Sequence, residues 1–116
     1  MTTKSQDKLL EKAGWKRGSH TDTIGNVISL WKKTGVVYST YDLPCRFTSL
    51  DWLFTNILPP IRKEYRVTGV AFTFHTDGTV SATLLTGNEL FYAFKAAEGA
   101  DPAEALLAAL CKLVEG

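Results

Sequence analysis

The chain has 116 residues with a hydrophobic share of 45%, which fits one domain spanning residues 1–116. Its thirteen basic residues nearly balance its twelve acidic residues, so the formal net charge of +1 gives no overall field that would favour a polyanionic partner. No apolar stretch approaches the ~20 residues of a membrane span, and the N-terminal segment lacks the apolar core of a signal peptide. Two cysteines without a Cys-x-x-Cys spacing indicate a reduced cytosolic protein rather than a disulfide framework.

The N-terminal part of the chain is expected to form one helix and two strands. Ser5 is placed to cap a helix over residues 6–13. Residues 15–25 contain glycine, serine and aspartate and are expected to form a loop. Residues 26–32 alternate as a strand does, and residues 36–40 are a candidate partner strand after a Thr-Gly turn.

The middle of the chain predicts a helix that a pair of prolines ends. Thr48 is a suitable N-cap, and Asp51 three residues later can return the bond as in a capping box. Pro59-Pro60 ends or kinks this helix, and residues 61–65 are expected to form a further turn. Trp52 lies off the main apolar face. That face consists of Leu50, Leu53, Phe54, Ile57 and Leu58.

The segment after residue 68 predicts an antiparallel meander of three strands. Apolar side chains alternate over residues 69–74, 80–84 and 90–94. Asp77-Gly78 supplies the positive φ of a tight hairpin turn between the first two strands, and residues 86–88 form a second turn signal.

The last segment predicts a helix with one buried stripe. Asp101 is its N-cap, Pro102 takes its first position and Glu104 its third. The stripe consists of Ala103, Leu106, Leu107, Leu110 and Val114. Together the elements predict an α+β fold in which helices pack on a twisted antiparallel sheet.

Few side chains could carry catalysis. His75 lies two residues before Asp77, but a turn-forming aspartate after a strand explains this pair better than an acid–base dyad, and no serine or cysteine is placed beside it as a nucleophile. His20 and Asp22 are only two potential metal ligands, with no third at a useful interval. We therefore expect no enzymatic activity, no metal and no cofactor.

Aromatic and basic residues gather in two stretches that suit a binding site. Arg46 follows Tyr41 in an irregular segment, and the second stretch is RKEYR at residues 62–66. Aromatic faces stack on bases and guanidinium groups hold phosphates, so these residue types suit a nucleotide-like ligand, although an ordinary solvated surface has a similar composition. Cys45 beside Arg46 is weak evidence for a reactive thiol, and Cys111 is expected to be buried.

Four short motifs are spread over most of the chain. They are KLLEKAGW at residues 8–15, YSTYDLP at 38–44, TSLD at 48–51 and DPAEAL at 101–106. Together they resemble the pattern of the phage ABA-sandwich family, whose name implies helix–sheet–helix layering, an α-β-α sandwich. One departure is Ala108, where the resemblance leads us to expect a basic residue.

The resemblance implies a function without turnover. It extends to the Thoeris anti-defence 1 proteins, which are phage-encoded sponges that sequester cyclic nucleotide immune signals as homo-oligomers. It therefore implies a phage or prophage counter-defence protein in the host cytoplasm. Such a protein would bind a cyclic ADP-ribose isomer or a cyclic oligonucleotide and would assemble as a dimer or hexamer.

The candidate ligand-binding residues follow from their chemistry. The arginines are expected to hold phosphates, the tyrosines to stack on bases, and two residues at sheet turns to bond to ribose or base edges. They are Tyr41, Arg46, Arg62, Tyr65, Arg66, Asp77 and Asn88. The alternative is a phage accessory protein that inhibits a host defence protein by direct contact, as anti-CRISPR proteins do, with surface aromatics as interface anchors. A nucleic-acid reader is least expected, because no basic stripe is visible in the sequence.

Overall fold

The computed structural model describes residues 3–39, 43–86 and 92–115, and it confirms the predicted α+β class. None of the helices in these ranges is long and apolar enough to cross a membrane. In chain order, the elements are α1 Thr3–Lys12, β1 Lys16–Thr21, β2 Val27–Lys33, β3 Val36–Ser39, α2 Leu43–Arg46, α3 Leu50–Asn56, α4 Leu58–Tyr65, β4 Gly69–Phe74, β5 Val80–Thr86, β6 Tyr92–Gly99 and α5 Pro102–Glu115.

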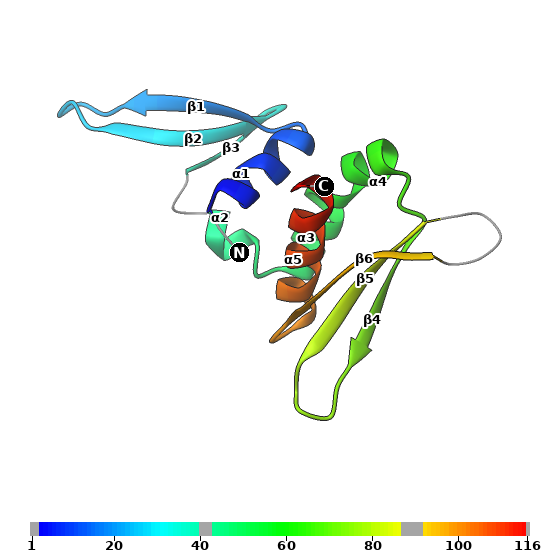
Figure 1. Ribbon diagram of the computed structural model, residues 1–116. Helices are drawn as coiled ribbons and strands as arrows, with labels where there is room; N and C mark the ends of the chain where they lie inside the picture. The colour runs from blue at the N-terminus through cyan, green and yellow to red at the C-terminus, as the bar shows by residue number, and fades with distance from the viewer. Residues whose placement is uncertain (1–2, 40–42, 87–91, 116) are drawn as a thin grey trace.

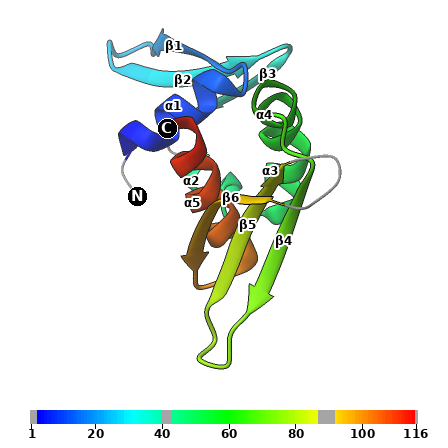
Figure 2. The same ribbon diagram turned by 45° about the vertical axis from the view of Figure 1, so that its right-hand side comes forward.

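The strands form two separate antiparallel sheets, with the orders β1-β2-β3 and β4-β5-β6. The helices lie between the two sheets (Figures 1 and 2). α1 contacts β1 and packs against α5, and α5 in turn covers β5 and β6. The packing of helices on an antiparallel sheet is as predicted. The layering of the molecule is sheet, helices, sheet, because the N-terminal strands form a sheet of their own.

The helix α5 supplies the largest part of the core. Asp101 Oδ1 accepts a hydrogen bond from the backbone N–H of Glu104 at 2.9 Å, which confirms the predicted N-cap. The whole predicted stripe is buried, and neighbouring residues such as Ala105 and Ala109 are fully buried as well. Burial extends round the helix because the sheet packs on one side of α5 and α1 on another.

α5 carries a partly buried hydrogen bond to α1 and a buried thiol. Ser5 was expected to cap the first helix, but α1 begins at Thr3, and the Ser5 hydroxyl instead donates to the Glu115 carboxylate. Cys111 is 3% exposed, as expected for a core residue. Burial, with a smaller contribution from the Glu115 charge, raises the pKa of Cys111 to about 12.

The predicted loop over residues 15–25 is wrong, because most of it is strand β1. β1 pairs along its length with β2, from Lys16 opposite Lys32 to Thr21 opposite Val27. Its sequence KRGSHT has no apolar alternation because nearly all of its side chains are exposed. The turn to β2 is fixed by Asp22, whose carboxylate accepts the backbone N–H groups of Ile24 and Asn26 at 3.0 and 2.8 Å.

The helix predicted over residues 49–58 is divided into α3 and α4. Its N-cap is Ser49, which accepts the Trp52 backbone N–H at 3.2 Å, whereas the predicted cap Thr48 donates its hydroxyl to the Cys45 carbonyl at 2.6 Å. Trp52 was expected off the buried face but is 8% exposed, and Phe54 is instead 38% exposed. α3 ends at Asn56 and only Ile57 separates it from α4, so the break lies ahead of the prolines that were expected to end or kink the helix. The prolines at 59 and 60 lie in the first turn of α4, where proline is tolerated, and residues 61–65, expected as a turn, continue this helix.

The C-terminal meander forms with the predicted antiparallel pairing, but its third strand β6 runs on to Gly99, beyond the predicted end at residue 94. β4 pairs with β5 and β5 with β6, and Val80, Ala82 and Leu84 are buried under α5. The apolar face is incomplete at the hairpin end, where Phe74 is 70% exposed. Residues 87–91, which include part of the predicted third strand and second turn, lie outside the described residues.

Candidate ligand-binding site

Four aromatic rings from separate segments pack together beside α3. The Trp15 ring centroid lies 5.6 Å from that of Tyr38 and 6.0 Å from that of Trp52, and Phe47 meets Trp52 edge-on at 5.7 Å. Trp52 Nε1 donates to the Tyr38 hydroxyl at 3.5 Å. Tilted and edge-on contacts are favoured because a ring edge is positive and a ring face negative. The four rings therefore form one rigid cluster, to which α3 contributes Trp52 and the segment between α2 and α3 contributes Phe47.

Two cations lie over this aromatic cluster. The Arg46 guanidinium carbon is 5.2 Å from the Tyr38 ring centroid, and Lys33 Nζ is 6.0 Å from that of Trp15. Lys33 Nζ also donates a hydrogen bond to the backbone carbonyl of Ala13 at 2.9 Å. No ion pair within the described part of the chain involves Arg46, so its charge is held in place and available to an anion.

Arg46 lines a hollow that we call the α2–α3 hollow. Its volume of about 430 Å³ falls within the range of small-molecule sites, and it is open to solvent. Asp51 and Thr55 are four residues apart on α3 and so share one side of it. The full lining is Cys45, Arg46, Ser49, Asp51, Trp52, Thr55 and Asn56. It combines a guanidinium group, a carboxylate, an amide, hydroxyls and an indole.

A second basic hollow lies on α4. The α4 hollow has a volume of about 310 Å³ and is lined by Pro59, Arg62, Lys63 and Val67. Arg62 Nε donates to the Val67 carbonyl at 3.3 Å, which orients its guanidinium group. This hollow presents two cations but no aromatic side chain.

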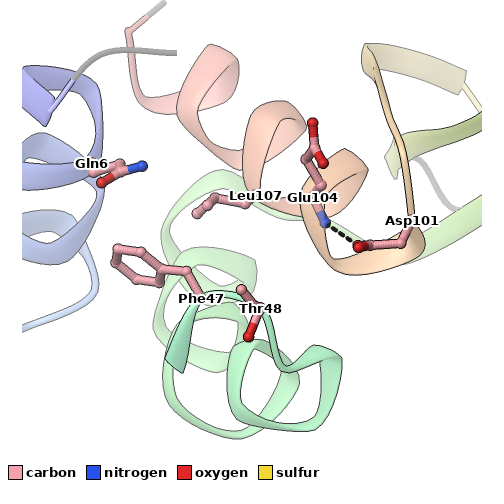
Figure 3. A pocket seen from close by; sticks show the side chains of 6 residues that line it. All are labelled: Gln6, Phe47, Thr48, Asp101, Glu104 and Leu107. Carbon is pink, nitrogen blue, oxygen red and sulfur yellow. Dashed lines mark hydrogen bonds between the residues drawn. The ribbon is translucent and has the colours of Figure 1, made fainter. Parts of the chain in front are cut away.

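The third hollow is smaller and acidic. Figure 3 shows it between α1 and α5, with the Gln6 and Phe47 side chains on one side and Asp101 and Glu104 on the other. Its volume is about 170 Å³, below that of usual small-molecule sites. Its two carboxylates disfavour an anion, so the α2–α3 hollow is the better candidate for a nucleotide-like ligand.

The structure distributes the predicted binding residues over several places. Arg46 lines the α2–α3 hollow and Arg62 the α4 hollow. Tyr65 is half-buried against the core, and Arg66 ends α4 in a left-handed conformation with φ 56°. Tyr41 and Asn88 lie outside the described residues. The predicted set is therefore not gathered into one hollow.

Asp77 lies apart from the basic residues of α4. Both views place its turn at the end of the β4–β5 hairpin away from α4 (Figures 1 and 2). The six residues of β4 span roughly 20 Å. Its carboxylate accepts the backbone N–H and the hydroxyl of Thr79 at 2.9 and 2.7 Å. These bonds are the main reason that its pKa is lowered, and they give Asp77 the turn-forming role that its sequence position suggests.

Next to this turn, the structure brings together two side chains that the sequence did not pair. His75 Nε2 lies 2.6 Å from the Ser81 hydroxyl oxygen. Antiparallel pairing places Ser81 opposite Thr73, and Thr73 lies two residues before His75 on the same strand. Side chains two residues apart lie on the same face of a strand, so the strand register could have predicted this contact. Neither residue lines any of the three hollows described above.

The polar residues of α3 were also missed as candidates. Asp51, Thr55 and Asn56 were treated only as helix residues, although all three line the hollow. Asp51 and Thr55 are four residues apart, as are Trp52 and Asn56. This spacing places the members of each pair on the same side of a helix, and it was the signal in the sequence that could have identified them. Asn56 Nδ2 donates a hydrogen bond to the backbone carbonyl of Trp52 at 3.2 Å. The side-chain amide oxygen of Asn56, Oδ1, is therefore available to accept a hydrogen bond from a ligand.

Comparisons with protein-family models, curated proteins and solved structures found no match for this chain. The resemblance to the phage ABA-sandwich family therefore stays a prediction, and the function has to be argued from the geometry of the chain.

Proposed function

We propose that this chain binds and sequesters a cyclic nucleotide signal, without turning it over, at the α2–α3 hollow. The observation that carries the proposal is Arg46, whose guanidinium is stacked 5.2 Å from the Tyr38 ring centroid and lines the hollow of about 430 Å³. A cation held in advance loses less conformational entropy when it binds phosphate, which favours tight binding.

The other lining groups complement the remaining parts of a nucleotide. The guanidinium of Arg46 has the fork geometry that matches phosphate oxygens. The Asp51 carboxylate can accept hydrogen bonds from ribose hydroxyls, and the free amide oxygen of Asn56 can accept one from a base edge.

The biological setting that we propose is phage or prophage counter-defence in the host cytoplasm, with the chain working as a homo-oligomer. This setting is supported by the four motifs that resemble the phage ABA-sandwich family. The open form of the α2–α3 hollow is compatible with a second subunit that covers the ligand.

The test is a thermal-shift and calorimetry screen against cyclic ADP-ribose isomers and cyclic di- and trinucleotides. A ligand at about 100 times its Kd should stabilise the protein by about 2.7 kcal/mol. After denaturation, chromatography should recover the ligand chemically intact. No shift with any of these compounds would reject the proposal, and recovery of an altered ligand would indicate an enzyme.

Matched variants locate the site. Arg46→Ala should weaken binding about 10- to 150-fold, which corresponds to about 1.5–3 kcal/mol for a charged hydrogen bond. Arg62→Ala is the control, because it removes the same charge from the α4 hollow and should leave the affinity unchanged. Loss of binding in Arg62→Ala but not in Arg46→Ala would move the site to α4.

A second function, inhibition of a host defence protein by direct contact, is favoured by the exposed apolar residues of β3. Val36 and Val37 are 41% and 54% exposed on a strand at the end of its sheet order. Edge strands of this kind can pair with a strand of another protein. Val37→Lys should abolish inhibition of the defence protein in cells while Arg46→Ala leaves it intact; the opposite pattern would support the ligand site.

A further inference from the structure

The turn between β4 and β5 places a general base beside a nucleophile. His75 Nε2 lies 2.6 Å from the Ser81 hydroxyl oxygen, outside the three hollows. A serine hydroxyl is a weak nucleophile on its own, and it is activated when a base within hydrogen-bond reach takes its proton. With its ring proton on Nδ1, neutral His75 has on Nε2 the lone pair that this step requires. The contact therefore has the geometry of a nucleophile and its base.

The turn holds the backbone of His75 on both sides. The His75 N–H donates to the Thr79 carbonyl at 2.9 Å, and the His75 carbonyl accepts the Gly78 N–H at 3.1 Å. Gly78 has a φ of 91°, which glycine adopts at no steric cost. A fixed backbone restricts where the imidazole can lie, so the base is near the hydroxyl group before a substrate arrives.

A carboxylate lies within electrostatic reach of the imidazole. The pKa of Asp77 is lowered mainly by hydrogen bonds from Thr79, and His75 adds a smaller contribution through its charge. The bonds from Thr79, at 2.9 and 2.7 Å, tie the carboxylate to the turn, so its charge stays beside the histidine. Because opposite charges attract, the Asp77 carboxylate favours the transfer of the serine proton to His75.

Ser81 lies on the face of its sheet that α5 does not cover. Its neighbours along β5, Val80 and Ala82, are buried under α5, and successive side chains of a strand point to opposite faces. On the open face, Ser81 stands between Thr73 of β4 and Glu98 of β6 in the strand register, and both of these residues are exposed. A molecule in solvent can therefore reach the hydroxyl group.

The charges beside this pair favour a neutral substrate. Asp77 lies near His75, and Glu98 lies opposite Ser81. Residues 69–86, which include β4 and β5, contain no lysine or arginine. A surface of this charge repels an anionic phosphoryl donor but not a neutral carboxylic ester. It therefore suits an acyl donor better than a phosphoryl donor.

We propose that His75 and Ser81 form a nucleophilic dyad, in which Ser81 accepts the acyl group of a neutral activated ester. The Ser81 oxygen attacks the ester carbonyl carbon while His75 Nε2 takes the hydroxyl proton. The bond between the carbonyl carbon and the leaving oxygen breaks, and His75 returns the proton to that oxygen. The products are acylated Ser81 and a free alcohol, so the step needs no other reactant. This reaction goes beyond the ligand binding proposed above and uses none of its residues.

The test is acetylation by p-nitrophenyl acetate, measured by the release of p-nitrophenol and by mass spectrometry of peptides from the digested protein. We expect one acetyl group on the peptide that contains Ser81. Ser81→Ala should lose both this acetyl group and the rapid release of p-nitrophenol. His75→Gln keeps a side chain that can hydrogen-bond to Ser81 but cannot act as a base, and it should slow acetylation of Ser81 about 100-fold.

Matched controls separate the chemistry from the fold. The chain has one other histidine, His20, and His20→Gln should leave the acetylation of Ser81 unchanged. The anion p-nitrophenyl phosphate should leave Ser81 unmodified. Thermal melting checks the fold of each variant. Arg46→Ala should be acetylated normally, so failure of this proposal is distinguishable from failure of the ligand site.

Four results would overturn the proposal. The first is acetylation of lysines without acetylation of Ser81, and the second is an equal rate at Ser81 in His75→Gln and the unmodified protein. The third is rapid release of p-nitrophenol that persists in Ser81→Ala, because a histidine would then be the nucleophile. The fourth is phosphorylation of Ser81 by p-nitrophenyl phosphate, which would contradict the selection of a neutral donor.

Discussion

Replacement of Gly99 by alanine tests the packing of β6 against α5. A Cβ at this position would lie 2.6 Å from the Ala105 nitrogen and 2.9 Å from two atoms of Glu104. The nearest of these are backbone atoms of the first part of α5 and cannot rotate away, so the helix and the sheet must separate. Overpacking of this kind destabilises a fold by about 1–3 kcal/mol. For a domain of this size, the melting temperature should fall by roughly 5–15 °C.

The measurement is thermal denaturation of Gly99→Ala followed by circular dichroism. Gly69→Ala is the matched control in the same sheet, because its added Cβ would make an ordinary contact with Leu85 Cδ1 at 3.6 Å. The control should melt within a few degrees of the unmodified protein. If Gly99→Ala melts as its control does, β6 and α5 are not in close contact there and the argument is refuted.

Three further predictions concern single groups. Burial raises the pKa of Cys111 to about 12, so a thiol reagent at pH 8 should modify Cys45 rapidly and Cys111 only after denaturation; two fast equivalents would contradict this burial. Ser49→Ala removes the acceptor for the Trp52 N–H and should lower the free energy of unfolding by about 0.5–2 kcal/mol in a urea titration, whereas no change would mean that α3 needs no cap. The folded pKa of Asp77 is lowered below 3.8, so the stabilisation from its charged form is present above that pH and is lost as the pH falls through the folded pKa. Asp77→Asn should therefore melt below the unmodified protein at pH 7, and a difference that does not shrink below pH 4 would exclude this charge as its cause.

The parts of the fold that the sequence predicted well depend on local signals. The cap at Asp101, the proline after it and the apolar stripe lie within one helix, so α5 followed from a short stretch of sequence. The meander followed from alternating apolar side chains and the Asp77 turn. β1 was missed because it is exposed on nearly every position, and an exposed strand carries no apolar period.

The candidate site depends on contacts between distant segments, and these were not available from the sequence. Arg46 was predicted to bind phosphate, but its support by Tyr38 requires β3 to return beside α2. The buried face of α3 was misjudged because the helix is only seven residues long and ends before the proline pair, so Trp52 turns inward and Phe54 outward. The same break places Arg62 in a hollow of its own on α4.

The contact between α1 and α5 has a consequence for the order in which the chain folds. Each sheet is built from neighbouring strands, and such short-range pairing forms quickly. The two meanders can therefore assemble during synthesis before α5 is available. Until α5 emerges from the ribosome, Ala82 and Leu84 lack their cover and Ser5 lacks the carboxylate to which it donates. A nascent chain that ends at Gly99 should thus expose an apolar sheet face and recruit chaperones, and the docking of one late helix completes the core.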